Sequence, residues 1–124
     1  METVYRAYLA CLDERRFGDL DAYVHDTVTY NGAPMTRTRY AELIAADVAA
    51  IPDLAFVVVR LVVAGDEVAA RLWFDCTPRG RWRGLEPDGR RVAFAEHVFY
   101  RFADGRIADV RSLIDIESVR DQLA

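Results

Sequence analysis

Residues 56–77 read FVVVRLVVAGDEVAARLWFDCT, and this stretch carries a clear strand signal. Its two halves, residues 56–64 and 68–77, are rich in β-branched and aromatic side chains, which favour strands. Gly65-Asp66 separates them and is typical of a tight turn between antiparallel strands. The stretch therefore predicts a hairpin of two long strands.

A second hairpin is predicted further along the chain. Val92 to Phe102 and Ile107 to Ile114 have the same strand-like composition, and they flank Asp104-Gly105, which is another two-residue turn signal. Residues 78–91 lie between the two hairpins and hold most of the turn formers, together with a cluster of arginines around Trp82. We expect that segment to be a loop.

The residues before the first hairpin have a helical pattern instead. Apolar side chains recur at three- and four-residue steps from Thr3 to Arg16, which predicts an amphipathic helix that Gly18 ends. A short helix over 19–24, a short strand over 27–30 and a helix that Thr38 caps and Pro52 ends are expected next. Helices first and strands afterwards indicate an α+β fold, because parallel α/β folds alternate the two.

Length and composition fit a single domain over residues 1–124, with residues 116–123 closing the chain as a helical turn. The formal net charge of -4 offers no electrostatic footprint for nucleic acid, and no apolar run is long enough to span a membrane. Cys11 and Cys76 lie far apart without metal-ligand spacing, so we expect buried thiols in a reducing cytosol. The start of the chain lacks the pattern of a signal peptide, which predicts a cytoplasmic protein.

Four short motifs mark the ends of the predicted strands. They are IPDL at 51–54, GDEVAAR at 65–71, GLEPDGR at 84–90 and FYRFADGRI at 99–107. In these motifs the chain resembles the SnoaL-like polyketide cyclases, a branch of the nuclear-transport-factor-2-like superfamily. The resemblance implies a cone-shaped fold, in which a curved antiparallel sheet and the N-terminal helices enclose a pocket.

The resemblance also implies a catalytic carboxylate in the last strand. In SnoaL-like cyclases it serves as acid and base for an intramolecular aldol condensation, and the matching residue here is Asp115. Asp115 interrupts the apolar stretch 113–116, which suits a carboxylate that exchanges protons away from water. The alternative interpretation is that Asp115 caps the terminal helix.

Two adjacent ionisable residues, Glu96 and His97, lie inside the predicted strand 92–102. Successive strand residues face opposite ways, so only one of the two faces the pocket unless a bulge intervenes. SnoaL-like relatives often have histidine there, which favours His97 as a second catalytic residue over a histidine in the core or at a dimer interface. A turn at 104–105 without a bulge would place His97 opposite Ser112, and a bulge would reverse that relation.

The predicted strand 68–77 supplies a candidate pocket wall. Arg71, Trp73 and Asp75 share one of its faces, where Trp73 would stack on a flat substrate and Arg71 or Asp75 would orient a polar group. A face in contact with water would show the same alternation. The other candidates for substrate binding are Tyr8, Tyr30, Tyr40, Phe99 and Arg111, of which Arg111 stands where a tryptophan is common among relatives. For the three tyrosines the alternative is a place in the core, which is typical of aromatic residues at helical spacing.

The motifs of cofactor and metal sites are missing from the sequence, so we expect no cofactor and no metal. The resemblance then favours an acid/base enzyme that cyclises or isomerises an activated, hydrophobic carbonyl compound in secondary metabolism. One alternative is an epoxide hydrolase or dehydratase of the same fold, built from Arg71, Asp75 and either Asp109 or Asp115. Another is a small-molecule-binding domain without catalysis.

The predicted strands between residues 56 and 114 carry more apolar side chains than three short helices can cover. We therefore expect a homodimer that forms through the open face of the sheet.

Overall fold

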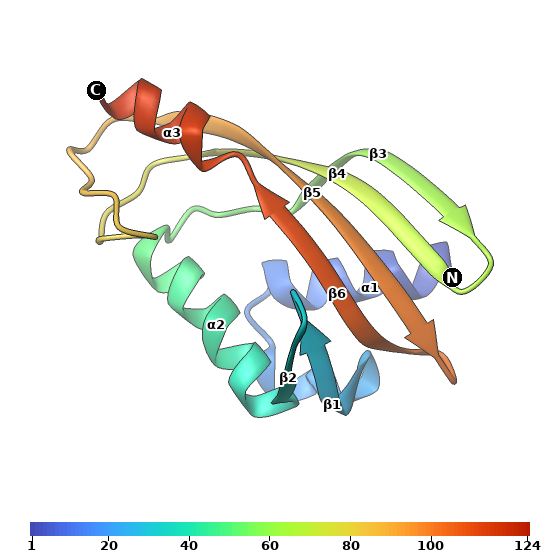
Figure 1. The fold of residues 1–124 in the computed structure, drawn as a ribbon. Coiled ribbons are helices and arrows are strands. Elements are labelled where there is room, and N and C mark those ends of the chain that lie inside the picture. Colours follow the sequence, from blue (N-terminus) through green and yellow to red (C-terminus); the bar gives the residue numbers. More distant parts are fainter.

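The computed structural model describes residues 1–124 as an α+β fold, which confirms the expected class. A helical N-terminal part is followed by long strands and a short terminal helix (Figure 1). The elements in chain order are α1 (Glu2–Asp13), the 3-10 helix η1 (Phe17–Ala22), β1 (Val24–Tyr30), β2 (Ala33–Thr36), α2 (Arg37–Ala50), β3 (Val57–Ala64), β4 (Glu67–Cys76), β5 (Val92–Ala103), β6 (Arg106–Ile114) and α3 (Ile116–Leu123).

All strands belong to one curved six-stranded sheet with the order β2-β1-β6-β5-β4-β3. Every neighbouring pair is antiparallel except β1 and β6, which run parallel, so the sheet is mixed rather than purely antiparallel. Figure 1 shows α1 and α2 on the concave side of the sheet, with α3 at one end of the long strands. We call the concave side the inner face and the opposite side the outer face.

The hydrophobic core lies between the inner face and the helices. On α1, the expected apolar stripe is buried, and its Tyr5 and Tyr8 are completely covered. Tyr5 packs against Tyr100 of β5 with ring centroids 4.9 Å apart. The core thus holds α1 across the long strands, and the space that remains lies nearer to α2.

No helix of the structure combines the length and the apolar character that crossing a membrane requires.

Three local expectations about the N-terminal half need correction. The helix expected over 19–24 is a 3-10 helix over 17–22, because Val24 already belongs to β1. Residues 33–36 form β2, a strand that was not expected, since Asn31 and Gly32 adopt positive φ and fold the chain back as a hairpin. The cap of α2 is Thr36 rather than Thr38, and its hydroxyl accepts a hydrogen bond from the Arg39 amide at 3.1 Å.

The hairpin between β5 and β6 contains a bulge. Ala103 pairs with Arg106 and Phe102 pairs with Ile107, as a tight turn requires. The next pair joins Arg101 to Asp109, which leaves Ala108 without a partner on β5. His97 consequently lies opposite Leu113, so the register that includes a bulge is the one that the chain adopts.

Candidate functional site

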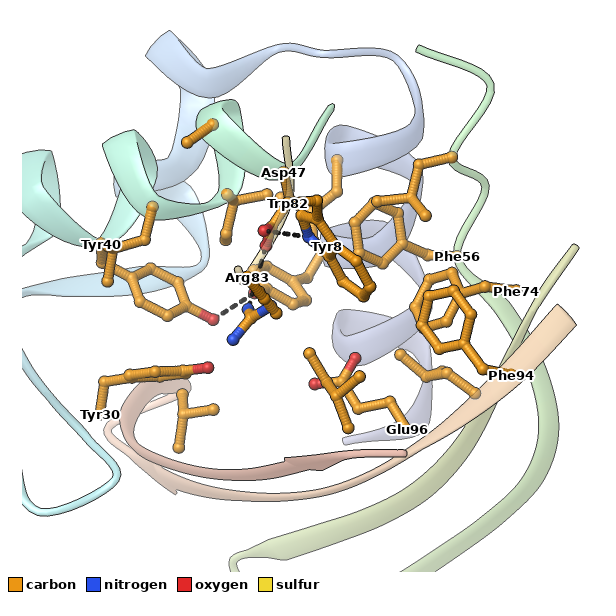
Figure 2. A pocket seen from close by; sticks show the side chains of 18 of the residues that line it. Tyr8, Tyr30, Tyr40, Asp47, Phe56, Phe74, Trp82, Arg83, Phe94 and Glu96 are labelled. Atoms are coloured by element: carbon orange, nitrogen blue, oxygen red, sulfur yellow. Dashed lines mark hydrogen bonds and ion pairs between the residues drawn. The ribbon is translucent and has the colours of Figure 1, made fainter. Parts of the chain in front are cut away.

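A cavity of about 310 Å³ lies between the inner face of the sheet, α1, α2 and the loop 77–91. Of the 19 residues that line it, 16 are hydrophobic, and aromatic rings from several elements surround the space (Figure 2). The charged lining residues are Asp47, Arg83 and Glu96. An apolar cavity with a few converging polar groups is the usual form of a small-molecule site.

Glu96 supplies the carboxylate of the cavity. It belongs to β5 and faces inward, toward α2 and the loop (Figure 2). Burial raises the pKa of this carboxyl group, because a charge is poorly solvated among apolar side chains. The Ser112 hydroxyl on the neighbouring strand donates a hydrogen bond to it, which lowers the pKa in part. Glu96 is therefore a carboxylate suited to accept and return a proton.

Tyrosine hydroxyls form a second polar group in the cavity. The hydroxyl oxygens of Tyr8 on α1 and Tyr40 on α2 lie 2.6 Å apart, and both side chains are buried. The Tyr30 ring lies 6.0 Å from the Tyr40 ring, measured between centroids. Burial raises the pKa of both Tyr8 and Tyr40, so the two hydroxyls stay protonated and serve as hydrogen-bond donors.

The loop between β4 and β5 contributes a tight turn to the cavity wall. Trp82 and Leu85 form an isolated β-bridge, and the two residues between them, Arg83 and Gly84, have φ of 48° and 78°. The Trp82 indole donates to an Asp47 carboxylate oxygen at 2.9 Å, which ties the turn to α2. The other Asp47 oxygen lies 3.4 Å from a guanidinium nitrogen of Arg83. This attachment places both Trp82 and Arg83 on the cavity wall.

These groups together offer a partly buried base, neutral donors and one cation around an apolar space. Such a set can remove a proton from a carbon next to a carbonyl and stabilise the oxyanion that forms. Nowhere in the structure do three or more His, Cys, Asp or Glu side chains gather as metal ligands would.

Some residues expected from the sequence to bind substrate do line the cavity. Tyr8, Tyr30 and Tyr40 come from three separate elements and meet there. Tyr8 belongs to the buried side of α1, Tyr40 to the buried side of α2, and Tyr30 ends β1.

The other expected binding residues, and His97, are positioned elsewhere. Arg71, Trp73, His97, Phe99 and Arg111 lie outside the cavity lining, on the outer face. There an Arg71 guanidinium nitrogen donates to His97 Nε2 at 2.7 Å. The expectation that His97 rather than Glu96 faces the cavity is wrong, because alternation along β5 turns the two neighbours to opposite sides and Glu96 is the inner one.

Two expected acidic residues also lie outside the cavity. Asp115 caps α3, and its carboxylate accepts a hydrogen bond from the Ser118 amide at 3.1 Å. Asp75 on β4 pairs with Arg91, whose guanidinium lowers the pKa of the Asp75 carboxyl group. The helix-cap interpretation of Asp115 thus describes its position, and neither carboxylate reaches the space around Glu96.

Sequence reasoning overlooked Asp47 and Arg83 as lining residues. Asp47 lies on a helix between apolar positions, and Arg83 belongs to a loop rich in arginine, so composition gives no reason to select either one. The only available signal was Arg83-Gly84 between Trp82 and Leu85, a two-residue turn flanked by large apolar side chains.

Comparison with known proteins adds a family match. A sequence profile described as SnoaL-like polyketide cyclase matches residues 2–123. A solved structure of a SnoaL-like polyketide cyclase from Agrobacterium tumefaciens is 41% identical in sequence, with a TM-score of 0.93 over 98% of this chain and 95% of that one. A search among curated proteins gave no match.

More distant solved structures share the fold. IdmH, a proposed polyketide cyclase from Streptomyces antibioticus, is 20% identical with a TM-score of 0.86 over 98% of this chain and 96% of its own. AclR, a proposed hydroxylase from Streptomyces galilaeus, is 21% identical with a TM-score of 0.81 over 98% of this chain and 93% of its own. The fold therefore carries proteins to which different reactions have been ascribed.

Proposed function

The chain belongs to the SnoaL-like polyketide cyclase family, and from this premise we propose that it is an acid/base enzyme acting on a hydrophobic, activated carbonyl compound. The reaction is an intramolecular aldol-type cyclisation or an isomerisation, as part of secondary metabolism. The observation that carries the proposal is Glu96, a partly buried carboxylate with a raised pKa that faces an apolar cavity large enough for a small molecule.

In the proposed reaction, ionised Glu96 removes a proton from the carbon next to a substrate carbonyl. The electron pair of that C–H bond becomes an enolate, whose oxygen accepts a hydrogen bond from the tyrosine pair Tyr8 and Tyr40. The enolate carbon then forms a bond to a second carbonyl carbon of the same molecule. Protonated Glu96 returns its proton to the new alkoxide, so the carboxylate is regenerated.

The apolar surroundings of Glu96 support this role. A carboxylate in water is a weak base at neutral pH, whereas a carboxylate with a raised pKa binds the transferred proton more strongly. The Ser112 hydrogen bond orients the Glu96 carboxylate and favours its ionised form, because it lowers the pKa. The side chains present are enough for every proton transfer in the sequence of steps.

Proton abstraction can be tested without the natural substrate. In D₂O, the protein should exchange the methyl protons of 2-acetylnaphthalene for deuterium faster than buffer does, as followed by NMR. Glu96→Gln should remove the acceleration, and Asp115→Asn should retain it because asparagine also caps helices well. Exchange that continues undiminished in Glu96→Gln would refute the proposed role of Glu96.

A small-molecule-binding function without catalysis is the second candidate, because the apolar lining favours it equally well. Absence of exchange with any activated ketone that binds in the cavity would favour that candidate. The epoxide hydrolase interpretation has less support, since Arg71, Asp75, Asp109 and Asp115 all lie outside the cavity lining.

We also propose that a second copy of the chain covers the outer face. Leu113 and Phe99 are 75% and 56% exposed there, and Trp73 is 39% exposed. Large apolar side chains gathered on one surface mark an association site, and a twofold dimer lets the same face serve both partners.

We also propose a cytoplasmic location, which fits the two buried, unpaired cysteines Cys11 and Cys76.

A further inference from the structure

Arg83 is the only cationic side chain that lines the cavity. In Figure 2 its guanidinium group extends into the cavity from the loop, while Glu96 extends from the sheet on the other side. The steps proposed above give Arg83 no role. A cation at the edge of an apolar space strongly attracts an anionic oxygen of a ligand.

The bond that holds Arg83 in place is a weak one. Its distance to Asp47 is 3.4 Å, and the two side chains are 37% and 25% exposed, so water screens their attraction. Asp47 also accepts the Trp82 indole hydrogen bond at 2.9 Å, so it keeps a close partner when Arg83 turns away. The guanidinium can therefore change partners while the loop stays attached to α2.

The backbone holds the position from which Arg83 reaches inward. Arg83 and Gly84 form the two-residue turn between the bridged residues Trp82 and Leu85, and the Arg83 guanidinium lies 5.5 Å from the Trp82 ring centroid. A cation over an aromatic face is attracted to it, which limits the directions that the side chain adopts. Arg83 is thus both charged and oriented before any ligand enters.

We propose that Arg83 binds an anionic oxygen of the substrate, so that the cavity selects flat apolar compounds that carry a carboxylate or an equally acidic group. This inference rests on the proposed function and names its substrate class. The planar guanidinium matches a carboxylate with two parallel hydrogen bonds. An anion held there directs the rest of the molecule across the cavity, toward Glu96.

Binding of two matched probes tests the inference without any turnover. Calorimetry with the purified protein should show 2-naphthoate binding about tenfold or more tightly than neutral 2-naphthamide, as expected of a charge-assisted hydrogen bond. Arg83→Gln should make the two affinities equal while naphthamide still binds. Arg83→Lys should keep part of the preference, because it retains the charge and loses the planar fork.

Arg81→Gln is the matched control in the same loop. Arg81 pairs with Glu86 at 3.3 Å and does not line the cavity, so this variant should keep the full preference for naphthoate. Glu96→Gln should keep or strengthen the preference, because it removes a negative charge that faces the same cavity, whereas it should abolish proton exchange. The two variants therefore separate substrate binding at Arg83 from proton transfer at Glu96. Equal affinities in the wild type, or a preference that persists in Arg83→Gln, would overturn the inference.

Discussion

The two sides of β5 hold adjacent ionisable residues in opposite surroundings. Glu96 is on the inner face, partly buried among apolar side chains, with Ser112 donating to its carboxylate. His97 is on the outer face, exposed, with an Arg71 guanidinium donating to its ring nitrogen. One step along the strand thus separates a group with a shifted pKa in a cavity from a group at an open surface. Surroundings, rather than residue type, select the candidate for proton transfer.

The two faces also differ in what their apolar residues do. On the inner face, Phe74 and Phe94 stack within the core at 5.1 Å between ring centroids. On the outer face, Phe99 and Leu113 are left uncovered by the chain itself. We therefore propose catalysis for the inner face of the sheet and association with a second copy for the outer face.

The largest expected effect contrasts the two neighbours on β5. Glu96→Gln should lower the turnover of an activated ketone by roughly 10²-fold or more, because it removes the base while it preserves shape. His97→Gln should leave turnover within about twofold, since surface changes away from the site have small effects. Initial rates on folded variants provide the measurement. A large loss in His97→Gln alone would reverse the assignment of the two faces.

A second test addresses the outer face. Leu113→Glu introduces a charge on the exposed side of β6 and should weaken the proposed dimer by at least about tenfold in dissociation constant, because a charge is costly to bury in an apolar interface. Sedimentation at several concentrations measures it, and Glu42→Gln on the exposed side of α2, away from the outer face, serves as a control. If the wild type is a monomer at all concentrations tested, the dimer proposal fails.

A smaller effect is expected from the partner of Glu96. The ionised carboxylate is the active base, so the rate should rise with pH through its raised pKa, above the ordinary glutamate range. Ser112→Ala removes a hydrogen bond that favours the ionised form, which moves this ascending limb to still higher pH. At a fixed pH on the limb the rate should fall by roughly threefold to tenfold, the size of one hydrogen bond. A limb that stays in place would show that Ser112 does not act on the catalytic group.

The smallest effect concerns the end of the chain. Asp115→Ala removes the cap of α3 and should lower the free energy of unfolding by about 1 kcal/mol, with Asp115→Asn close to the wild type. Turnover per folded molecule should stay the same, since Asp115 lies outside the cavity. Urea unfolding measures the first quantity and initial rates the second. A drop in turnover with an unchanged free energy of unfolding would show that Asp115 takes part in the reaction.

The long strands and the α+β class were predictable because their signals are local. Gly65-Asp66 and Asp104-Gly105 each join two runs of β-branched and aromatic residues, and the structure turns at both places. The helix over residues 37–50 was also expected, with an error of two residues at its cap. β2 was overlooked because its four residues carry little strand character of their own and depend on pairing with β1.

The candidate site was only partly predictable, because it depends on register. Tyr8, Tyr30 and Tyr40 were candidates as aromatic residues in predicted helices and a predicted strand, a local pattern that core residues share. Deciding between Glu96 and His97 required knowing which face of β5 lines the cavity. Alternation along a strand sorts its residues into two faces, but it does not tell which face is the inner one. The same ambiguity placed Trp73 in the predicted pocket wall and on the observed outer face.

The unpaired Ala108 has a consequence for how relatives of different length compare with this chain. With Ala108 deleted, Ile107 and Asp109 would become consecutive and would still lie opposite Phe102 and Arg101. Val110 and the residues after it would keep their sides of the sheet, so a one-codon deletion at this position preserves the cavity. In an alignment with a relative that is one residue shorter in β6, the gap is therefore expected at the bulge, where Ala108 has no partner on β5. A change of length there leaves the same residues of β6 on the inner face and the same residues on the outer face.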